Sequence, residues 1–152
     1  MSTTPSYAAQ SSQSPLAHHL ISRRSVGTKD VQIAIEFCGV CHTDIHHSRN
    51  DWGRANYPMV PGHEIVGKVT ALGANAGHLK IGQQVAVGCF VNACRTCSSC
   101  QSNMEQYCLN GLTATYNSPT KDPGGFTYGG YSKSIVVDQH FVLKIPDGLD
   151  PA

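Results

Sequence analysis

The chain has 152 residues, of which 40% are hydrophobic and 14% charged, and its formal net charge is +1 at pH 7. This length suffices for one domain with a buried core. Binding to nucleic acid or to a membrane surface needs clustered Lys and Arg, and a membrane span needs ~20 consecutive apolar residues. Neither feature is present in the sequence, so we expect no nucleic-acid or membrane partner.

The N-terminal residues 1–15, MSTTPSYAAQSSQSP, contain no basic segment followed by an apolar one, so they do not read as a secretory signal. Their Ser and Gln content predicts a loosely held arm. The seven cysteines of a chain without an export signal indicate a reducing compartment, and we expect the protein in the cytoplasm.

Short runs of aliphatic and β-branched residues between turn signals predict five strands. These strands cover residues 31–37, 65–73, 84–88, 134–137 and 141–145. Short strands at close spacing are typical of a barrel or a sandwich. Helical spacing of polar and apolar residues predicts one short helix over 41–49, which needs packing to be stable. The glycine-rich residues 123–126 lack the Lys and Ser/Thr of a phosphate loop and predict a turn.

Four cysteines follow the spacing C-x2-C-x2-C-x7-C, and they are Cys94, Cys97, Cys100 and Cys108. A two-residue gap allows a tight turn that directs two sulfurs at one point, which predicts a closed structural zinc site in a lobe over residues 92–116. An iron–sulfur cluster is the main alternative, but the ferredoxin run ends with a three-residue gap and a proline, and here Leu109 follows. Disulfides would suit a small secreted protein.

A second set of possible metal ligands lies upstream, where Cys41 is followed after twenty-two residues by the pair His63-Glu64. A thiolate, an imidazole and a carboxylate suit Zn²⁺, and the glycine-opened turn before His63 would present its ring from a fixed position. Two alternatives remain open. Cys38 and Cys41 form a C-x-x-C motif that could be a redox pair, and a lone histidine is more often structural than a ligand.

Three motifs occur in order: CGVCHTD at 38–44, YPMVPGHE at 57–64, and the four-cysteine segment that ends with EQYC at 105–108. Together they resemble the zinc-containing medium-chain alcohol dehydrogenases, and most closely the cinnamyl-alcohol-dehydrogenase-like branch of NADP-dependent aldehyde reductases. NSPT at 117–120 and GGYS at 129–132 resemble the bacterial members. The resemblance extends from about Tyr7 to the last residue.

The resemblance implies a mainly β fold, a GroES-like barrel with short helices and a zinc-binding lobe. Residues 1–152 would form the N-terminal catalytic domain of a longer enzyme, truncated before the family's Rossmann domain. The third ligand of the catalytic zinc would lie beyond residue 152, since the spare thiols of Cys38 and Cys89 do not stand where the family has it. The full-length form is expected to be a homodimer.

The same resemblance implies the metal ligands of the catalytic site. Cys41 and His63 resemble ligands of the catalytic zinc, and Glu64 resembles a carboxylate that can approach the metal when water leaves. Asp44 resembles the partner that orients His63. Together with the four-cysteine site, this predicts one catalytic and one structural zinc ion.

Three further residues of the segment 41–49 resemble parts of the family's proton relay and cofactor site. Thr43 resembles the hydroxyl that accepts the alcohol proton beside the cofactor. His46 resembles the outer end of the relay, and His42 a residue next to the cofactor pyrophosphate. The simpler alternatives are that Thr43 and Asp44 cap the helix and that His46 is a surface histidine.

Three neighbouring residues have less specific readings. His47 is expected on the surface. Trp52 and Tyr57 either line the substrate pocket or only pack the loop that carries them.

The predicted function is that of a zinc-dependent, NADP-linked alcohol dehydrogenase acting on a small aldehyde or alcohol. Zinc would act as a Lewis acid, and hydride would pass between the substrate carbon and NADP(H). The isolated 152-residue chain is expected to be inactive, and the alternative function is a truncated zinc-binding module. A zinc-ribbon nucleic-acid binder is disfavoured because the lobe has Arg95 as its only basic residue.

Overall fold

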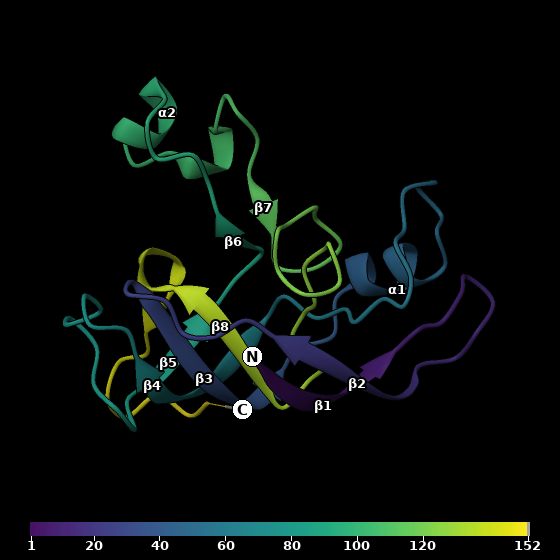
Figure 1. Ribbon diagram of the computed structural model, residues 1–152, viewed down its shortest axis with the longest axis horizontal. Helices are drawn as coiled ribbons and strands as arrows, with labels where there is room; N and C mark the ends of the chain where they lie inside the picture. The colour runs from purple at the N-terminus through teal and green to yellow at the C-terminus, as the bar shows by residue number, and fades with distance from the viewer. Residues whose placement is uncertain (152) are drawn as a thin grey trace.

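The computed structural model describes residues 1–151, so the last residue of the predicted domain 1–152 lies outside the described residues. Strands dominate this part of the chain, and the helices are short (Figure 1). The strands are β1 (Ser2–Ala8), β2 (Ala17–Arg23), β3 (Asp30–Cys38), β4 (Ile65–Leu72), β5 (Gln84–Val87), β6 (Phe90–Asn92), β7 (Thr113–Ala114), β8 (Ser134–Asp138) and β9 (Leu143–Lys144). The helices are α1 (His42–Ser48) and α2 (Ser98–Gln101), with 3-10 turns η1 (Glu105–Tyr107) and η2 (Gln139–Phe141).

The main sheet is antiparallel and five-stranded, in the order β8-β3-β4-β5-β9. Alternating aliphatic residues of its strands form the core. Those with essentially no exposed surface include Val31, Ile33, Ile65, Val69, Val85, Val87 and Val137. Burial of each such side chain contributes roughly 1.5–3 kcal/mol. The predicted period-two patterns therefore correspond to real strands, and the mainly β prediction is confirmed.

The prediction for residues 141–145 is wrong in part. The chain forms the 3-10 turn η2 first, because the Asp138 carboxylate accepts a hydrogen bond from the His140 N–H at 2.9 Å. Only Leu143 and Lys144 then pair with β5, as β9. The aliphatic residues at 141–145 predicted a strand and gave no sign of the hydrogen bond between Asp138 and His140.

The prediction of a loose N-terminal arm is also wrong. Residues 2–8 form β1, which pairs with β2 in antiparallel register from Ser2↔Arg23 to Ala8↔Ala17. Thr4, Ser6 and Ala8 are buried in alternation, and the Ser6 hydroxyl donates to the His19 carbonyl at 2.8 Å. Small polar residues let this strand approach the rest of the protein closely, so its composition misled the prediction.

Arg23, on β2, is almost fully buried and holds the segment that precedes β8. Its guanidinium donates at 2.7–2.9 Å to the carbonyls of Tyr128, Gly129 and Ser134 and to the Ser132 hydroxyl. Burial lowers the pKa of Arg23 to about 10. These four bonds fix the segment that carries Tyr131 into the candidate site.

The four-cysteine lobe projects from the main sheet on the β6–β7 pair and contains α2 and η1 (Figure 1). Two ion pairs connect it to the region around β8 and η2: Arg95 with Asp138 at 2.9 Å, and Glu105 with His140 at 2.7 Å.

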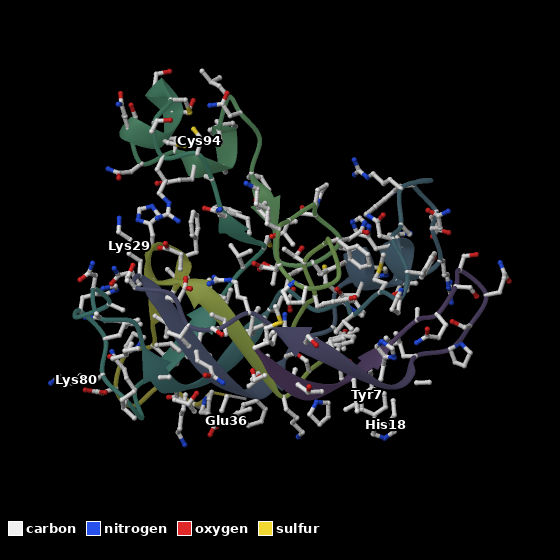
Figure 2. All side chains as sticks on the ribbon, in the orientation of Figure 1. Tyr7, His18, Lys29, Glu36, Lys80 and Cys94 are labelled. Carbon is white, nitrogen blue, oxygen red and sulfur yellow. The ribbon has the colours of Figure 1, made fainter. Side chains whose placement is uncertain are left out.

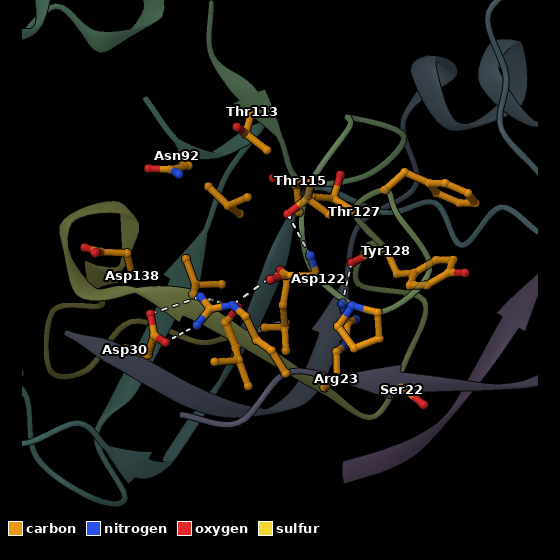
Figure 3. Close-up of a pocket in the computed structure, with 18 of the residues that line it drawn as sticks. Ser22, Arg23, Asp30, Asn92, Thr113, Thr115, Asp122, Thr127, Tyr128 and Asp138 are labelled. Atoms are coloured by element: carbon orange, nitrogen blue, oxygen red, sulfur yellow. Dashed lines mark hydrogen bonds and ion pairs between the residues drawn. The ribbon is translucent and has the colours of Figure 1, made fainter. Parts of the chain in front are cut away.

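A polar cavity of about 330 Å³ lies between the lobe and the sheet (Figure 3). Its lining includes none of the predicted metal ligands. None of the helices within residues 1–151 has both the length and the hydropathy of a membrane-spanning segment.

Candidate functional site

The sulfurs of the four-cysteine lobe are arranged as a zinc site requires. The Sγ atoms of Cys94, Cys97, Cys100 and Cys108 all lie within 4.8 Å of one another. The Sγ atoms of Cys94 and Cys100 are 3.9 Å apart. A regular tetrahedron with Zn–S bonds of ~2.3 Å has S···S edges of ~3.8 Å. Figure 2 labels Cys94 within this lobe. The residues therefore fit a tetrathiolate zinc ion.

Backbone N–H groups point at these sulfurs. The Cys97 N–H lies 3.4 Å from Cys94 Sγ, the Cys94 N–H 3.5 Å from Cys108 Sγ, and the Leu109 N–H 3.4 Å from Cys97 Sγ. Donors at these positions favour the negatively charged thiolate, which is the form that binds metal. All seven cysteines of the chain are free thiols, which excludes the disulfide alternative in this structure.

The thiols of the lobe differ in acidity. N–H groups of Thr96 and Cys97 lower the pKa of Cys94 to about 5. Burial and then the neighbouring sulfur of Cys97 oppose ionisation of Cys100 and raise its pKa. A divalent metal bound by all four sulfurs would balance the negative charge of their thiolates.

The second cluster consists of Cys41, His63 and Glu64, whose ligand atoms also lie within 4.8 Å of one another. Cys41 is the N-cap of α1, and His63 precedes β4 in the turn that Gly62 opens with a φ of +100°. His63 is buried, whereas Glu64 is exposed. The cluster thus offers a soft thiolate, a buried imidazole and a carboxylate that can reach the same point from solvent.

Asp44, which is 3% exposed, joins the two segments that carry these ligands. Its carboxylate accepts hydrogen bonds from the Cys41 N–H at 3.0 Å, the Gly62 N–H at 2.9 Å and the Tyr131 hydroxyl at 3.2 Å. Its Oδ1 is 4.0 Å from Nδ1 of His63. Asp44 therefore caps α1, as the simpler reading of the sequence suggested, and also lies where it can orient His63.

Cys38 is a partly buried thiol that fills space between neighbouring backbone segments. Its sulfur fills the space left by Gly62 and Gly130, where a Cβ atom would come within 2.8 and 2.7 Å of it. Burial raises the pKa of Cys38 to about 11. Reactive redox thiols have lowered pKa values, so the raised pKa and the packing of Cys38 argue against the C-x-x-C alternative.

The three residues predicted for proton transfer and cofactor binding lie on α1. Thr43 Oγ1 is 3.5 Å from Cys41 Sγ, and so lies beside the metal cluster. His46 is 43% exposed, and its Nδ1 lies 2.8 Å from the Asp51 carboxylate. The rings of His42 and His46 are 6.4 Å apart. The helix therefore leads from the metal cluster at Thr43 to solvent at His46.

The expectation that His47 is a surface residue is wrong, because it is half-buried in an aromatic cluster. Its ring meets Trp52 and Tyr116 edge-on, at centroid distances of 4.8 and 5.3 Å. The Asn117 side-chain amide donates to its Nδ1 at 3.0 Å. Trp52 thus packs against α1 while remaining 47% exposed, and the Tyr57 hydroxyl donates to a carbonyl of the same helix.

Two tyrosines of the site did not emerge from the sequence. Tyr131 donates to Asp44, and the ring of Tyr116 lies parallel to that of His63, at 5.7 Å and 6°. Tyr131 lies in the motif GGYS and Tyr116 directly precedes the motif NSPT, and these motifs were used only as evidence of family resemblance. Nothing in their spacing predicts contact with residues that are distant in sequence.

Comparison with known proteins identifies the fold. The model of the alcohol dehydrogenase GroES-like domain matches residues 27–147. The chain belongs to this family. Its antiparallel five-stranded sheet and appended lobe are thus the family's fold, and residues 1–151 contain only antiparallel pairings, unlike a Rossmann domain.

Among curated members of the family, the chain is 53% identical over 149 residues to NADP-dependent alcohol dehydrogenase C of Mycobacterium bovis, covering 98% of this chain and 43% of that protein. It is 49% identical over 142 residues to a probable cinnamyl alcohol dehydrogenase 3 of Oryza sativa, covering 93% and 38%. The chain therefore spans about two fifths of the length of these relatives. They confirm the resemblance to the cinnamyl-alcohol-dehydrogenase-like branch.

Solved structures agree. A cinnamyl alcohol dehydrogenase of Sorghum bicolor superposes with a TM-score of 0.94 at 43% identity, over 99% of this chain and 42% of that one. A cinnamyl alcohol dehydrogenase of Helicobacter pylori, solved in complex with NADP(H), gives 0.92 at 36% identity, over 98% and 43%. The GroES-like fold expected from the sequence is confirmed.

Proposed function

We propose that residues 1–152 are the N-terminal catalytic domain of a zinc-dependent, NADP-linked alcohol dehydrogenase, with residues 92–116 as its structural zinc lobe. The reaction is hydride transfer between NADP(H) and a small alcohol or aldehyde. The observation that carries this proposal is the convergence of Cys41, His63 and Glu64 on one point, with Asp44 bracing both segments. The choice of NADP rests on relatives described as NADP-dependent.

The donor set fits a catalytic zinc ion with an open position. Cys41 and His63 would hold the metal, and Glu64, exposed beside them, would be a further oxygen ligand. A zinc ion here would supply Lewis-acid chemistry to the alcohol or carbonyl oxygen of the substrate. A third protein ligand supplied by a longer chain would complete the site.

The residues of α1 would carry the proton. The Thr43 hydroxyl, next to Cys41, would accept the proton of the alcohol. His46 would release it to solvent, because its ring is exposed and pairs with Asp51. General acid–base groups of this kind contribute roughly 10²–10⁴-fold to rate.

The exposed end of α1 would face the cofactor, with His42 near its pyrophosphate and Thr43 beside its nicotinamide half. Hydride transfer is chemistry of NADP(H), and this domain would contribute orientation and proton handling. We place the enzyme in the cytoplasm, as a homodimer in its full-length form.

The alternative function is a zinc-binding module without catalysis. It is favoured by the lobe, whose four proposed ligands come from one short segment, whereas the second cluster combines Cys41 with His63 and Glu64 from a separate segment. A chain that cannot position a nicotinamide would lose the ~7–11 kcal/mol that orientation can contribute.

The assay that separates these functions is NADPH oxidation by zinc-loaded protein with aromatic and aliphatic aldehydes. We expect turnover from an enzyme that carries this domain together with a nucleotide-binding domain, and none from residues 1–152 alone. Cys41→Ala should abolish turnover, and Cys89→Ala, a matched thiol outside the proposed ligand set, should retain it. Turnover that survives Cys41→Ala would contradict the proposal.

A further inference from the structure

Tyr116, just after β7, is packed directly on the buried histidine of the candidate metal site. It is 4% exposed. Its ring lies parallel to the imidazole of His63, and its edge contacts His47. Contact on the face of an imidazole restricts rotation about the bond that joins the ring to its Cβ, a torsion with broad intrinsic preferences. The Tyr116 ring thus constrains the direction in which His63 presents its nitrogen.

The hydroxyl of Tyr116 is buried and has no hydrogen-bond partner among the described residues. A buried hydroxyl without a partner destabilises a fold, and a phenylalanine would fill the same space without this cost. The ring of Tyr116, and not its hydroxyl, is therefore the part of the residue that contacts His63.

We propose that Tyr116 is a positioning residue of the metal site, with its ring holding the plane of the His63 imidazole. Asp44, the carboxylate that can orient His63, accepts a hydrogen bond from the Tyr131 hydroxyl. Two tyrosines would then support His63, Tyr131 through Asp44 and Tyr116 through its own ring. This inference rests on the proposed function only in assuming that Cys41 and His63 bind a metal.

Cobalt(II) binding tests the inference independently of turnover, because cobalt replaces zinc and its thiolate absorption reports on the site. The part of the spectrum that Cys41→Ser abolishes defines the Cys41–His63 site. At this site we expect Tyr116→Leu to weaken cobalt affinity about tenfold or more, in line with the 10–100-fold effects of partners that orient metal ligands. Tyr116→Phe, which keeps the ring, should stay within about threefold of the unmodified protein.

Tyr7→Leu is the matched control, because Tyr7 also packs on a histidine, His18, which is not a proposed metal ligand (both are labelled in Figure 2). It should leave cobalt affinity unchanged. Unchanged cobalt affinity and an unchanged spectrum in Tyr116→Leu would overturn the inference. It would also be overturned if Tyr116→Leu lowered cobalt affinity equally at the four-cysteine site, or if Tyr116→Phe lowered cobalt affinity as much as Tyr116→Leu does. If the unmodified protein showed no Cys41-dependent cobalt signal, the metal site of the proposed function would itself be wrong.

Discussion

The Asp44 carboxylate accepts a hydrogen bond from the backbone N–H of Gly62 at 2.9 Å, and this contact connects α1 to the turn that carries His63. The same carboxylate accepts the Cys41 N–H. The positions of Cys41 and His63 thus depend on one buried side chain.

We expect Asp44→Ala to lower the free energy of unfolding by about 2–4 kcal/mol, because two buried N–H groups lose their acceptor. Asp44→Asn should cost less, since its amide oxygen can keep the bond to Gly62. Urea unfolding measures both. Asp51→Ala, at an exposed carboxylate, is the control. A loss below about 1 kcal/mol in Asp44→Ala would show that Asp44 does not brace these segments.

Cys100→Ser should release the zinc of the lobe and destabilise it, because the affinity of a structural metal is also folding free energy. Metal analysis of purified protein should show the loss of one zinc per chain relative to the unmodified protein. Cys89→Ser, at an exposed thiol outside the cluster, should retain full zinc content. Unchanged zinc in Cys100→Ser would rule out the four-cysteine site.

Thr43→Ala should lower kcat by roughly 10²–10⁴-fold in an enzyme that carries this domain, while the free energy of unfolding changes little. The reason is that its hydroxyl lies beside the metal cluster. His46→Gln should weaken activity mainly at lower pH, as expected of a group at the solvent end of a relay. Thr70→Ala, on the exposed face of β4, is the control. Full turnover in Thr43→Ala, with hydride transfer rate-limiting, would exclude Thr43 from the mechanism.

Folding stability should depend on the ionisation of His47. Burial, and next the charge of Arg54, lower the pKa of His47 from its ordinary value of 6.5. The unfolded chain then binds the proton more readily than the folded one, so stability is present above about pH 6.5 and falls as the pH drops through the folded-state pKa. The bond from Asn117 to Nδ1 agrees, since it needs that nitrogen unprotonated.

The measurement is the urea midpoint between about pH 7 and pH 5 for the unmodified protein and His47→Gln. The variant should lose less stability on acidification than the unmodified protein. His18→Gln, at an exposed histidine, should follow the unmodified curve. Identical curves for all three proteins would mean that His47 contributes nothing to the acid sensitivity.

The lobe should be coupled to the sheet through Arg95, whose guanidinium pairs with Asp138 and lies 5.3 Å from the Phe141 ring centroid. A double-mutant cycle with Arg95→Met and Asp138→Asn should give a coupling free energy of about 1 kcal/mol. The exposed pair of Lys68 and Glu36 should give about half that or less. Equal couplings would show that the lobe contact is an ordinary surface pair.

Local patterns predicted the elements that depend on neighbouring residues. The helix expected over 41–49 is α1 with Cys41 and Arg49 as its caps, and β4 and β5 end within one residue of their predicted bounds. The spacing of the four cysteines was sufficient to predict that their sulfurs lie close together in the lobe. These features are local, because period and spacing act over a few residues.

The remaining features depend on long-range contacts. β2 escaped prediction because its alternation contains the buried Arg23, whose partners lie more than a hundred residues away. His47 read as a surface residue because Tyr116 and Asn117, which cover it, are distant in sequence. No pattern in one segment reports which side chain of another will pack on it.

The first strand has a practical consequence for anyone trimming this protein. The family match begins at residue 27, so a truncated protein designed on that boundary would lack β1 and β2. Yet the Tyr7 N–H donates to the Tyr131 carbonyl at 2.8 Å, and the Lys133 N–H donates to the Pro5 carbonyl at 3.0 Å. A clone that starts at residue 27 would leave the Tyr131 segment without its neighbour, and metal-binding measurements made on it would describe a damaged site.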